Sequence, residues 1–313
     1  MTKTPSDGNI LGITLTGNQK MDLLSEIEYF LVKKDKRGSR SASVFGRFIP
    51  GKLFITTPNP EQMVIASQDP KFKKILLASD VRLCDGVGLA AWSKFLNLPK
   101  TNVQVLKPIF YLLQGLYIEM SIIFNRNMLE KHQTVIKGRE MFLDLLRLAN
   151  KHQWKIFLLG GRKSVNEKAV SVLTKKYKKI IFQEESGPLL NVNGVPLNGE
   201  ELRVDQIAVQ KINKFKPDLL FVGFGAPKQE KWVYQRLAKL NISGTMVIGG
   251  TLDQIAGTRL NVPSLINNFG LEWLWRLFTG SQNLERIYNA VIRFPILVYQ
   301  EKLRMNLVRG FEN

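Results

Sequence analysis

Polar side chains and glycines follow several short apolar runs in this sequence, where they could form a site at strand ends. Asp85 comes directly after the apolar run 81–84, with Gly86 and Gly88 behind it. A carboxylate at the mouth of a sheet, beside glycines that let a ligand approach closely, can act as a general base. A simple Asp-Gly turn or helix cap explains the same residues and stays the alternative.

A second polar pair follows the apolar run 52–57. Thr57 and Asn59 each precede a proline, which favours extended geometry at both positions. They are candidates to line a binding pocket, although Asn59 also suits the N-cap of a helix that begins at Pro60. The residues alone leave both interpretations open.

Paired glycines mark two further strand ends. Gly160 and Gly161 separate a strand from a helix and are followed by Arg-Lys, which suits an anion at a helix N-terminus. Gly249 and Gly250 repeat the arrangement, and Asp253 beyond them could contact a ribose or a base. Neither segment has the G-x-G-x-x-G or P-loop pattern, so a specific nucleotide fingerprint is absent and plain turns are the alternative.

The stretch 221–233, FVGFGAPKQEKWV, runs from an apolar strand through glycines, among them Gly225, into a Pro-Lys-Gln-Glu helix start. The glycines let the backbone close on a substrate, and Gln229 is the side chain that we expect to contact it. Lys228 and Glu230 either face the same place or form a pair on the surface of the first helical turn.

The elements that must position these residues alternate along the chain. Short apolar runs predict strands at 10–15, 52–57, 81–84, 155–160, 179–183, 218–224 and 244–250. Helical periodicity predicts helices at 18–34, 60–79, 86–96, 138–152, 163–177, 200–214 and 227–240. This alternation predicts an α/β fold with a mostly parallel, Rossmann-like sheet and helices on both faces. The carboxyl ends of the strands would then form one crevice that suits a nucleotide-linked substrate.

Two units are expected, an α/β core over 1–258 and a C-terminal helical appendage over 259–313. Two stretches of the core, near 33–50 and 98–132, lie outside this alternation, and the family resemblance given below marks them as insertions. The second insertion contains an apolar stretch, VLKPIFYLLQGLYIEMSIIF, that is interrupted by Lys, Gln and Glu. We interpret it as a buried or interfacial helix rather than a membrane span, and packing on the core or on a partner is the alternative. The Gly-, Pro- and Asn-rich segment 186–200 predicts a long loop or small hairpin.

The composition limits the partners. Among 313 residues, 45 Lys and Arg stand against 26 Asp and Glu, a net charge of +19 that indicates an anionic partner or surface. A single cysteine, Cys84, excludes an intrachain disulfide and fits a reducing compartment. The two histidines lack cysteine neighbours at ligand spacing, so no metal site is expected. The polar N-terminal segment predicts no signal peptide.

Taken together, these segments resemble the WecG/TagA/CpsF family of bacterial glycosyltransferases, glycosyltransferase family twenty-six. The resemblance covers roughly residues 10 to 295 and keeps the order of the family's motifs. The matching segments are TTPNPEQ, DGVG, GREMFLDLL, IFLLGG, PDLLFVGFGAPKQEKW, IGGTLDQIAGTRLNVP and GLEWLWRL. The glycine-rich run into Pro-Lys-Gln-Glu and the Gly-Leu-Glu-Trp-Leu run are the specific parts.

The resemblance implies an inverting, metal-independent transferase that needs no cofactor. Its donor would be a UDP-sugar, typically of N-acetylmannosamine or its uronic acid, and some members use other hexoses, such as glucose for exopolysaccharide. The acceptor would be an undecaprenyl-diphosphate-linked amino sugar at the cytoplasmic face of the membrane, to which the protein would bind peripherally. The family's proposed base falls on Asp85, its pocket-lining Thr and Asn on Thr57 and Asn59, and its Gln on Gln229.

The resemblance also assigns arginines and membrane docking to the C-terminal appendage, where Arg276, Arg286 and Arg293 are the candidates. TGSQNLER stands where the family usually has Glu-Pro-x-Arg, so the arginines there are expected to be held differently. One face of the tail is apolar and fits an anionic membrane interface: Ile287, Val291, Phe294 and Val298. Packing of this face on the core, or on another subunit of a homo-oligomer, is the alternative.

Two other classes of protein share some of these features. A nicotinamide-dependent oxidoreductase would show G-x-G-x-x-G with an acidic residue about 20 positions later, and this pattern is missing. A nucleotide- or nucleic-acid-binding protein without transferase activity would use the positive charge and stays the alternative from a different class. The sequence shows no nucleic-acid-binding motif, so nucleic acid is not an expected partner.

Overall fold

The computed structural model describes residues 8–33, 49–125, 128–129, 133–258 and 283–308, with isolated positions between 263 and 279. Its centre is a parallel sheet in the order β4-β3-β8-β7-β5-β6. The strands are β3 (Leu53–Thr56), β4 (Val81–Arg82), β5 (Lys155–Leu159), β6 (Ile181–Glu185), β7 (Leu219–Val222) and β8 (Gly244–Val247). The α/β fold with a parallel sheet is therefore confirmed.

The apolar run 10–15 is the exception, because it does not join this sheet. It folds back on itself as a small antiparallel pair, β1 (Asn9–Ile10) and β2 (Ile13–Thr14). Leu11 and Gly12 both have positive φ, and this left-handed backbone reverses the chain after two residues. The prediction of one continuous strand over 10–15 is therefore wrong, because the turn at Leu11 and Gly12 divides the run.

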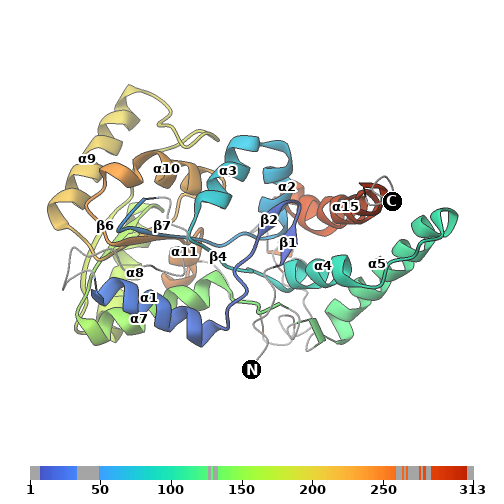
Figure 1. Cartoon of the computed structure of the whole chain (residues 1–313). Helices are drawn as coiled ribbons and strands as arrows, with labels where there is room; N and C mark the ends of the chain where they lie inside the picture. Colours follow the sequence, from blue (N-terminus) through green and yellow to red (C-terminus); the bar gives the residue numbers. More distant parts are fainter. Residues whose placement is uncertain are drawn as a thin grey trace.

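Helices cover both faces of the sheet, as predicted (Figure 1). One face carries α1 (Lys20–Lys33), α7 (Gly138–His152) and α8 (Lys163–Lys176). The other face carries α3 (Pro70–Ala78), α9 (Gly199–Phe215) and α10 (Lys228–Arg236). Side chains of one strand alternate between the two cores: Phe221 packs with α7, and Val222 packs in the core of α9 and α10.

The predicted helix 60–79 is divided into α2 (Pro60–Gln68) and α3 by the Asp69-Pro70 step. Asp69 is extended because the following proline disfavours helical geometry at the residue before it. Its carboxylate caps α3 by accepting a hydrogen bond from Phe72 N at 3.0 Å. The break turns the second half of the predicted helix onto the sheet face that α10 occupies.

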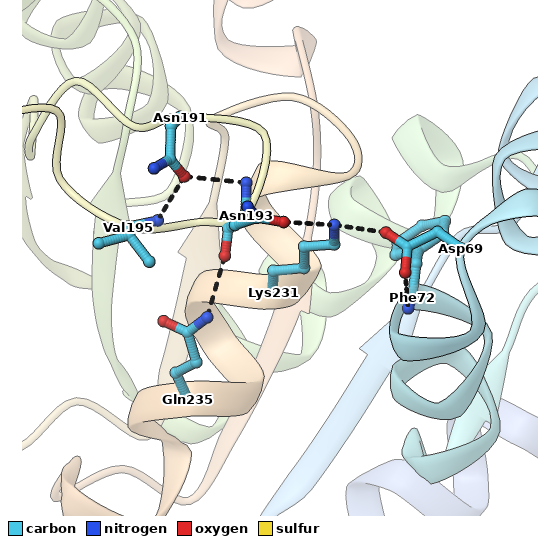
Figure 2. Close-up of polar contacts among 7 residues, drawn as sticks. All are labelled: Asp69, Phe72, Asn191, Asn193, Val195, Lys231 and Gln235. Atoms are coloured by element: carbon cyan, nitrogen blue, oxygen red, sulfur yellow. Dashed lines mark hydrogen bonds and ion pairs between the residues drawn. The ribbon is translucent and has the colours of Figure 1, made fainter.

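Lys231 joins this break to the segment predicted as a loop or small hairpin, which is a hairpin with a bridge between Leu190 and Pro196. The Lys231 side chain is 5% exposed, and its Nζ lies 2.6 Å from Asp69 Oδ2 and 3.4 Å from Asn193 Oδ1. Figure 2 shows this lysine between α3 and the hairpin, with Gln235 donating to the Asn193 carbonyl. A buried cation therefore ties three segments that are distant in the sequence.

The remaining helices project to one side of the sheet (Figure 1). α4 (Val87–Asn97) leads through the 3₁₀ turn η1 (Gln104–Leu106) to α5 (Lys107–Phe124). The tail forms α14 (Leu284–Tyr288), the π-helical turn η3 (Asn289–Arg293) and α15 (Phe294–Val308), which pack with α2, α4 and α5. Strand β8 is followed by the short helix α11 (Thr251–Ile255).

The apolar face of the tail lies mostly in this packing. Ile287, Phe294 and Val298 are 7%, 1% and 0% exposed, and the latter two share a core with residues of α2, α4 and α5. Packing on the core, the alternative named for this face, is what the structure shows for Phe294 and Val298. The division into a core and an appendage stays a prediction, and most of the first insertion lies outside the described residues.

Candidate active site

The predicted strand-end residues lie along the carboxyl edge of the sheet, in the order of their strands. Asp85 follows β4, Thr57 follows β3, Gly249 follows β8, Gly225 follows β7 and Gly160 follows β5. The row therefore has an end with a carboxylate and a hydroxyl, and an end made of glycine turns. This is the arrangement expected from a parallel sheet, whose strands all end at the same edge.

Asp85 and Thr57 meet at a third residue, Gly138. A Cβ atom placed on Gly138 would lie 3.3 Å from Asp85 Oδ2 and 3.0 Å from Thr57 Cγ2, so the absence of a side chain there lets the three segments approach. The Asp85 loop is fixed on both sides, since Asp85 N donates to the Pro58 carbonyl at 3.2 Å and Ile136 N donates to the Cys84 carbonyl at 3.0 Å. Gly138 was not predicted as a site residue, although it begins the segment GREMFLDLL.

Gly138 is also the first residue of α7, a helix of 15 residues without a side-chain N-cap. The positive end of its dipole, with backbone N–H groups that have no intrahelical acceptor, therefore lies beside the Asp85 carboxylate. Asp85 is partly exposed and Thr57 is 7% exposed, so the carboxylate stands at the boundary between the core and solvent. Such a position suits a base that must meet an incoming hydroxyl group.

Asn59 caps a helix, as its alternative interpretation proposed. Its backbone is extended, and its Oδ1 accepts a hydrogen bond from Gln62 N at 3.0 Å at the start of α2. Its side-chain oxygen is thus engaged with the backbone, while the amide nitrogen makes no hydrogen bond to any described residue. A pocket-lining role for Asn59 stays a prediction and would involve that nitrogen.

Close backbone packing joins the glycine turns. A Cβ on Gly160 would lie 2.7 Å from the Gly223 carbonyl carbon, and a Cβ on Gly223 would lie 2.8 Å from the Gly249 oxygen. Gly225 and Gly249 have φ of +78° and +50°, and nothing lies within 4 Å of a Cβ on either. Gly160 therefore serves packing between strand ends, and the other two turns border open space where a diphosphate could approach.

Three predicted residues lie next to these turns: Gly161, Gly250 and Asp253. Gly161 has φ of +81°, and a Cβ there would meet Asn166 Oδ1 at 2.8 Å. Gly250 is the N-cap residue of α11, and Asp253 lies in its first turn, where its carbonyl accepts from Thr258 N at 3.0 Å. Nucleotide contacts from Gly161, Gly250 and Asp253 stay predictions.

Gln229 holds two of the glycine turns together. Its Oε1 accepts from Gly225 N at 3.2 Å and from Gly249 N at 3.1 Å, and its side chain is almost fully buried. Its Nε2 donates to Glu230 Oε1 at 2.9 Å. Gln229, predicted to contact substrate, therefore acts in this structure as a positioning residue that sets the spacing of the β7 and β8 turns.

Glu230, which follows it, is fully buried, so its alternative interpretation as part of a surface pair is wrong. Burial raises the pKa of its carboxyl group to about 7, against the opposing effect of the hydrogen bond from Gln229. Gln62 Nε2 approaches the same oxygen at 3.4 Å. Within the described part of the chain, Glu230 Oε2 has no hydrogen-bond partner. The signal available in the sequence was only a Glu in the first turn of a helix.

Arg286 of the C-terminal tail forms an ion pair near these residues. Its Nε lies 2.7 Å from Glu61 Oε1, in the first turn of α2 and beside the cap residue Asn59. Arg293 lies at the opposite end of α2, next to the Gln68 side chain, and is exposed. Arg276 lies outside the described residues. Of the predicted arginines, the structure thus brings Arg286 toward the strand-end row.

Comparison with known proteins identifies the family. The model of the glycosyl transferase WecG/TagA/CpsF family matches residues 42–124 and 119–307. The chain belongs to this family. Among its relatives is an N-acetylglucosaminyldiphosphoundecaprenol N-acetyl-beta-D-mannosaminyltransferase of Staphylococcus aureus (strain MRSA252), 23% identical over 292 residues, which are 93% of this chain and 91% of the relative. The protein of the same name from strain NCTC 8325 / PS 47 matches with the same identity and coverage.

Membership in the WecG/TagA/CpsF family makes the protein a glycosyltransferase. The carboxylate end of the strand-end row supplies a group that can accept a proton, and the glycine end supplies backbone turns beside open space. A group that accepts a proton and backbone N–H groups that face negative charge are both features that glycosyl transfer can use.

Proposed function

We propose that the protein transfers a sugar, N-acetylmannosamine or its uronic acid, from UDP to an undecaprenyl-diphosphate-linked amino sugar, with inversion and without a metal ion. The observation that carries this proposal is the meeting of Asp85, Thr57 and Gly138 at one end of the strand-end row. The activity by which the Staphylococcus aureus relatives are named supports N-acetylmannosamine as the sugar and a lipid-linked acceptor. The product would serve cell-wall or surface-polysaccharide synthesis.

In this proposal Asp85 removes the proton from the acceptor hydroxyl while that oxygen attacks the anomeric carbon from the face opposite UDP. The C–O bond to UDP breaks as the new glycosidic bond forms, and inversion follows from this single displacement. Thr57 and Asn59 line the acceptor side, and the turns at Gly225 and Gly249 take the diphosphate. Negative charge on the departing UDP is stabilised by backbone N–H groups at helix starts and by Arg286.

A second candidate within the family is transfer of another hexose, such as glucose from UDP-glucose for exopolysaccharide. The low identity to the Staphylococcus aureus relatives, 23%, supports keeping this candidate. Both candidates share Asp85 as the base and differ only in the contacts that the sugar ring makes.

The test is a panel of UDP-sugars incubated with a lipid-diphosphate amino-sugar acceptor, with release of UDP as the readout. Asp85→Asn is expected to lower turnover by a factor of about 10² to 10⁴, the usual contribution of a general base. Asp22→Asn, a change on the outer helix α1, is the matched control and should keep full activity. Turnover of Asp85→Asn near the level of the unmodified protein would remove Asp85 as the base.

Addition of a chelator tests the metal-independent reaction separately. Release of UDP should be unchanged in excess chelator, and recovery of a lost activity on adding Mg²⁺ or Mn²⁺ would contradict this part of the proposal. Retention of the product's anomeric configuration relative to the donor would contradict the single displacement.

A further inference from the structure

Helix α5 exposes an apolar face along its whole length. Its outward side chains are between 36% and 73% exposed: Ile109, Phe110, Leu112, Leu113, Leu116, Tyr117, Met120, Ile123 and Phe124. At 3.6 residues per turn, these positions cover roughly 160° of the helix circumference. The η1 turn before it adds Val105, which is 86% exposed. With η1, it forms a 21-residue stretch that is long and apolar enough to cross a membrane, and only 28% of an apolar 18-residue part of it is buried.

The polar side chains of α5 point toward the protein instead. Lys107 is 6% exposed, and its Nζ donates to Gln104 Oε1 at 2.8 Å. Glu119 accepts a hydrogen bond from Trp92 Nε1 of α4 at 2.9 Å, and burial raises the pKa of its carboxyl group. A helix on a water-exposed surface has the opposite arrangement, with polar side chains outward. The orientation of its side chains therefore indicates that the outer side of α5 lies in an apolar environment.

Neighbouring helices fix α5 in this orientation. Gly115 packs close to α4, since a Cβ there would lie 3.5 Å from Trp92 Cη2. Lys302 of α15 is fully buried and donates to Gln114 Oε1 at 2.7 Å, and Tyr299 donates to the Pro108 carbonyl at 3.0 Å. The apolar face cannot turn inward without breaking these contacts, so its exposure is a property of the fold.

Charge favours an anionic membrane as the partner of this face. The exposed side chains of α5 include no acidic residue, and in the sequence the helix is preceded by Lys100 and followed by Arg126, Glu130 and Lys131. The whole chain carries a net charge of +19. A net positive protein with an exposed apolar helix face has the combination of features that binds the interface of anionic bilayers.

The absence of polar groups disfavours a second protein as the partner. Protein interfaces carry about one hydrogen bond per 100–200 Å², with a polar rim. Across the α5 face the one polar side-chain atom is the Tyr117 hydroxyl, which lies 3.2 Å from Met128 Sδ. The acyl chains of a bilayer have no hydrogen-bonding groups, so they match this face better than a protein surface does.

We propose that α5 is the membrane-docking element of this protein and lies in the plane of an anionic bilayer, with its apolar face among the acyl chains. The stripe of Lys107, Tyr111, Gly115, Ile118 and Ser121 is buried against protein from one end of the helix to the other. Crossing the bilayer would require its partner helices to enter with it. A helix bound along the surface keeps these contacts intact.

The position of α5 in the chain links docking to the candidate base. α4 begins at Val87, two residues after Asp85, and the chain that leaves through α4 and α5 returns to Asp85 at Gly138. The segment that docks is therefore inserted between two neighbours in the site. This part of the inference rests on the proposed function: docking brings a lipid-linked acceptor to the edge where Asp85 lies.

Vesicle co-sedimentation of the full chain tests the docking surface. The double variant Leu113→Glu, Leu116→Glu is expected to bind phosphatidylglycerol-containing vesicles about tenfold more weakly or worse, because charges replace side chains that enter the acyl region. The control Leu202→Glu, Ile207→Glu changes two side chains of similar exposure on α9 and should leave binding unchanged. Circular dichroism and thermal unfolding check that both variants are folded.

The outcomes separate this inference from the proposed function. Weaker vesicle binding by the α5 variant alone, with unchanged transfer to a short, water-soluble acceptor, supports α5 as the docking surface. Equal binding of the α5 variant and the unmodified protein overturns the inference, and so does a dimer in sedimentation velocity that the α5 variant abolishes without any vesicle binding. Failure of every UDP-sugar to react, with α5-dependent vesicle binding retained, overturns the proposed function alone.

Discussion

Glu230 gives a prediction whose size follows from its burial. Its carboxyl group is fully buried, and its pKa is raised from the usual 4.5 to about 7. In the unfolded chain the group ionises near pH 4.5, so above this pH the folded state binds more protons than the unfolded state, and stability falls as the pH rises. At 1.36 kcal/mol per pKa unit, the loss reaches about 3 kcal/mol above pH 7. At pH 5 it is below about 1 kcal/mol.

Glu230→Gln removes this titration and keeps an oxygen that can accept the hydrogen bond from Gln229. The difference in unfolding free energy between the variant and the unmodified protein should therefore shift in favour of the variant by about 2 kcal/mol from pH 5 to pH 8. Urea unfolding followed by tryptophan fluorescence at several pH values measures it. Glu200→Gln, an exposed change in the first turn of α9, is the matched control and should give a flat difference.

A difference for Glu230→Gln that stays flat with pH would refute this reasoning. A shift in the opposite direction would refute it as well, because it would mean that the folded protein stabilises the ionised carboxylate. The same experiment bears on the site, since Glu230 supports the Gln229 side chain that holds the turns at Gly225 and Gly249.

Three further substitutions test which contacts hold the candidate active site and helix α5 in place. Gln229→Ala leaves the N–H groups of Gly225 and Gly249 without their acceptor and should lower the free energy of unfolding by about 1–3 kcal/mol, measured by urea unfolding. It should also lower the affinity for UDP-sugar at least severalfold, measured by calorimetry, and unchanged affinity would contradict a positioning role. Gly160→Ala places a Cβ 2.7 Å from the Gly223 backbone at φ of +108° and should lower the free energy of unfolding by roughly 2 kcal/mol or more. In the control Gly199→Ala nothing lies within 4 Å of the new Cβ, so stability should not fall; equal effects of the two changes would contradict the close packing. Lys302→Met removes the donor to Gln114 Oε1 and to the Phe95 and Leu98 carbonyls, and the Phe95 carbonyl keeps its hydrogen bond from Leu98 N. The loss should cost about 1–3 kcal/mol in unfolding free energy, while the exposed Arg304→Met should cost far less; thermal unfolding compares the two.

Much of the local structure could be predicted because it depends on neighbours in the chain. The strand preceding Gly223 and the helix from 138 to 152 were both predicted from periodicity, and the structure has them at nearly the same bounds. The helix over 60–79 was predicted too long because the pattern continues through Asp69, while the Asp-Pro step stops it. The sequence left two interpretations of Asn59 open, pocket lining and an N-cap, and the structure confirmed the N-cap.

The sequence by itself determined the mostly parallel α/β fold, the strand ends that carry the candidate residues and the family of the protein, since these depend on periodicity and on motif order. Only the tertiary structure decided that Gly138 meets Asp85, that Gln229 spans two turns and that Glu230 is buried. It also decided that the tail packs its apolar face on the core while α5 leaves its own exposed. The physical reason is the same in each case: a local pattern shows that a side chain is polar or apolar, but what lies against it is supplied by residues far away in the chain.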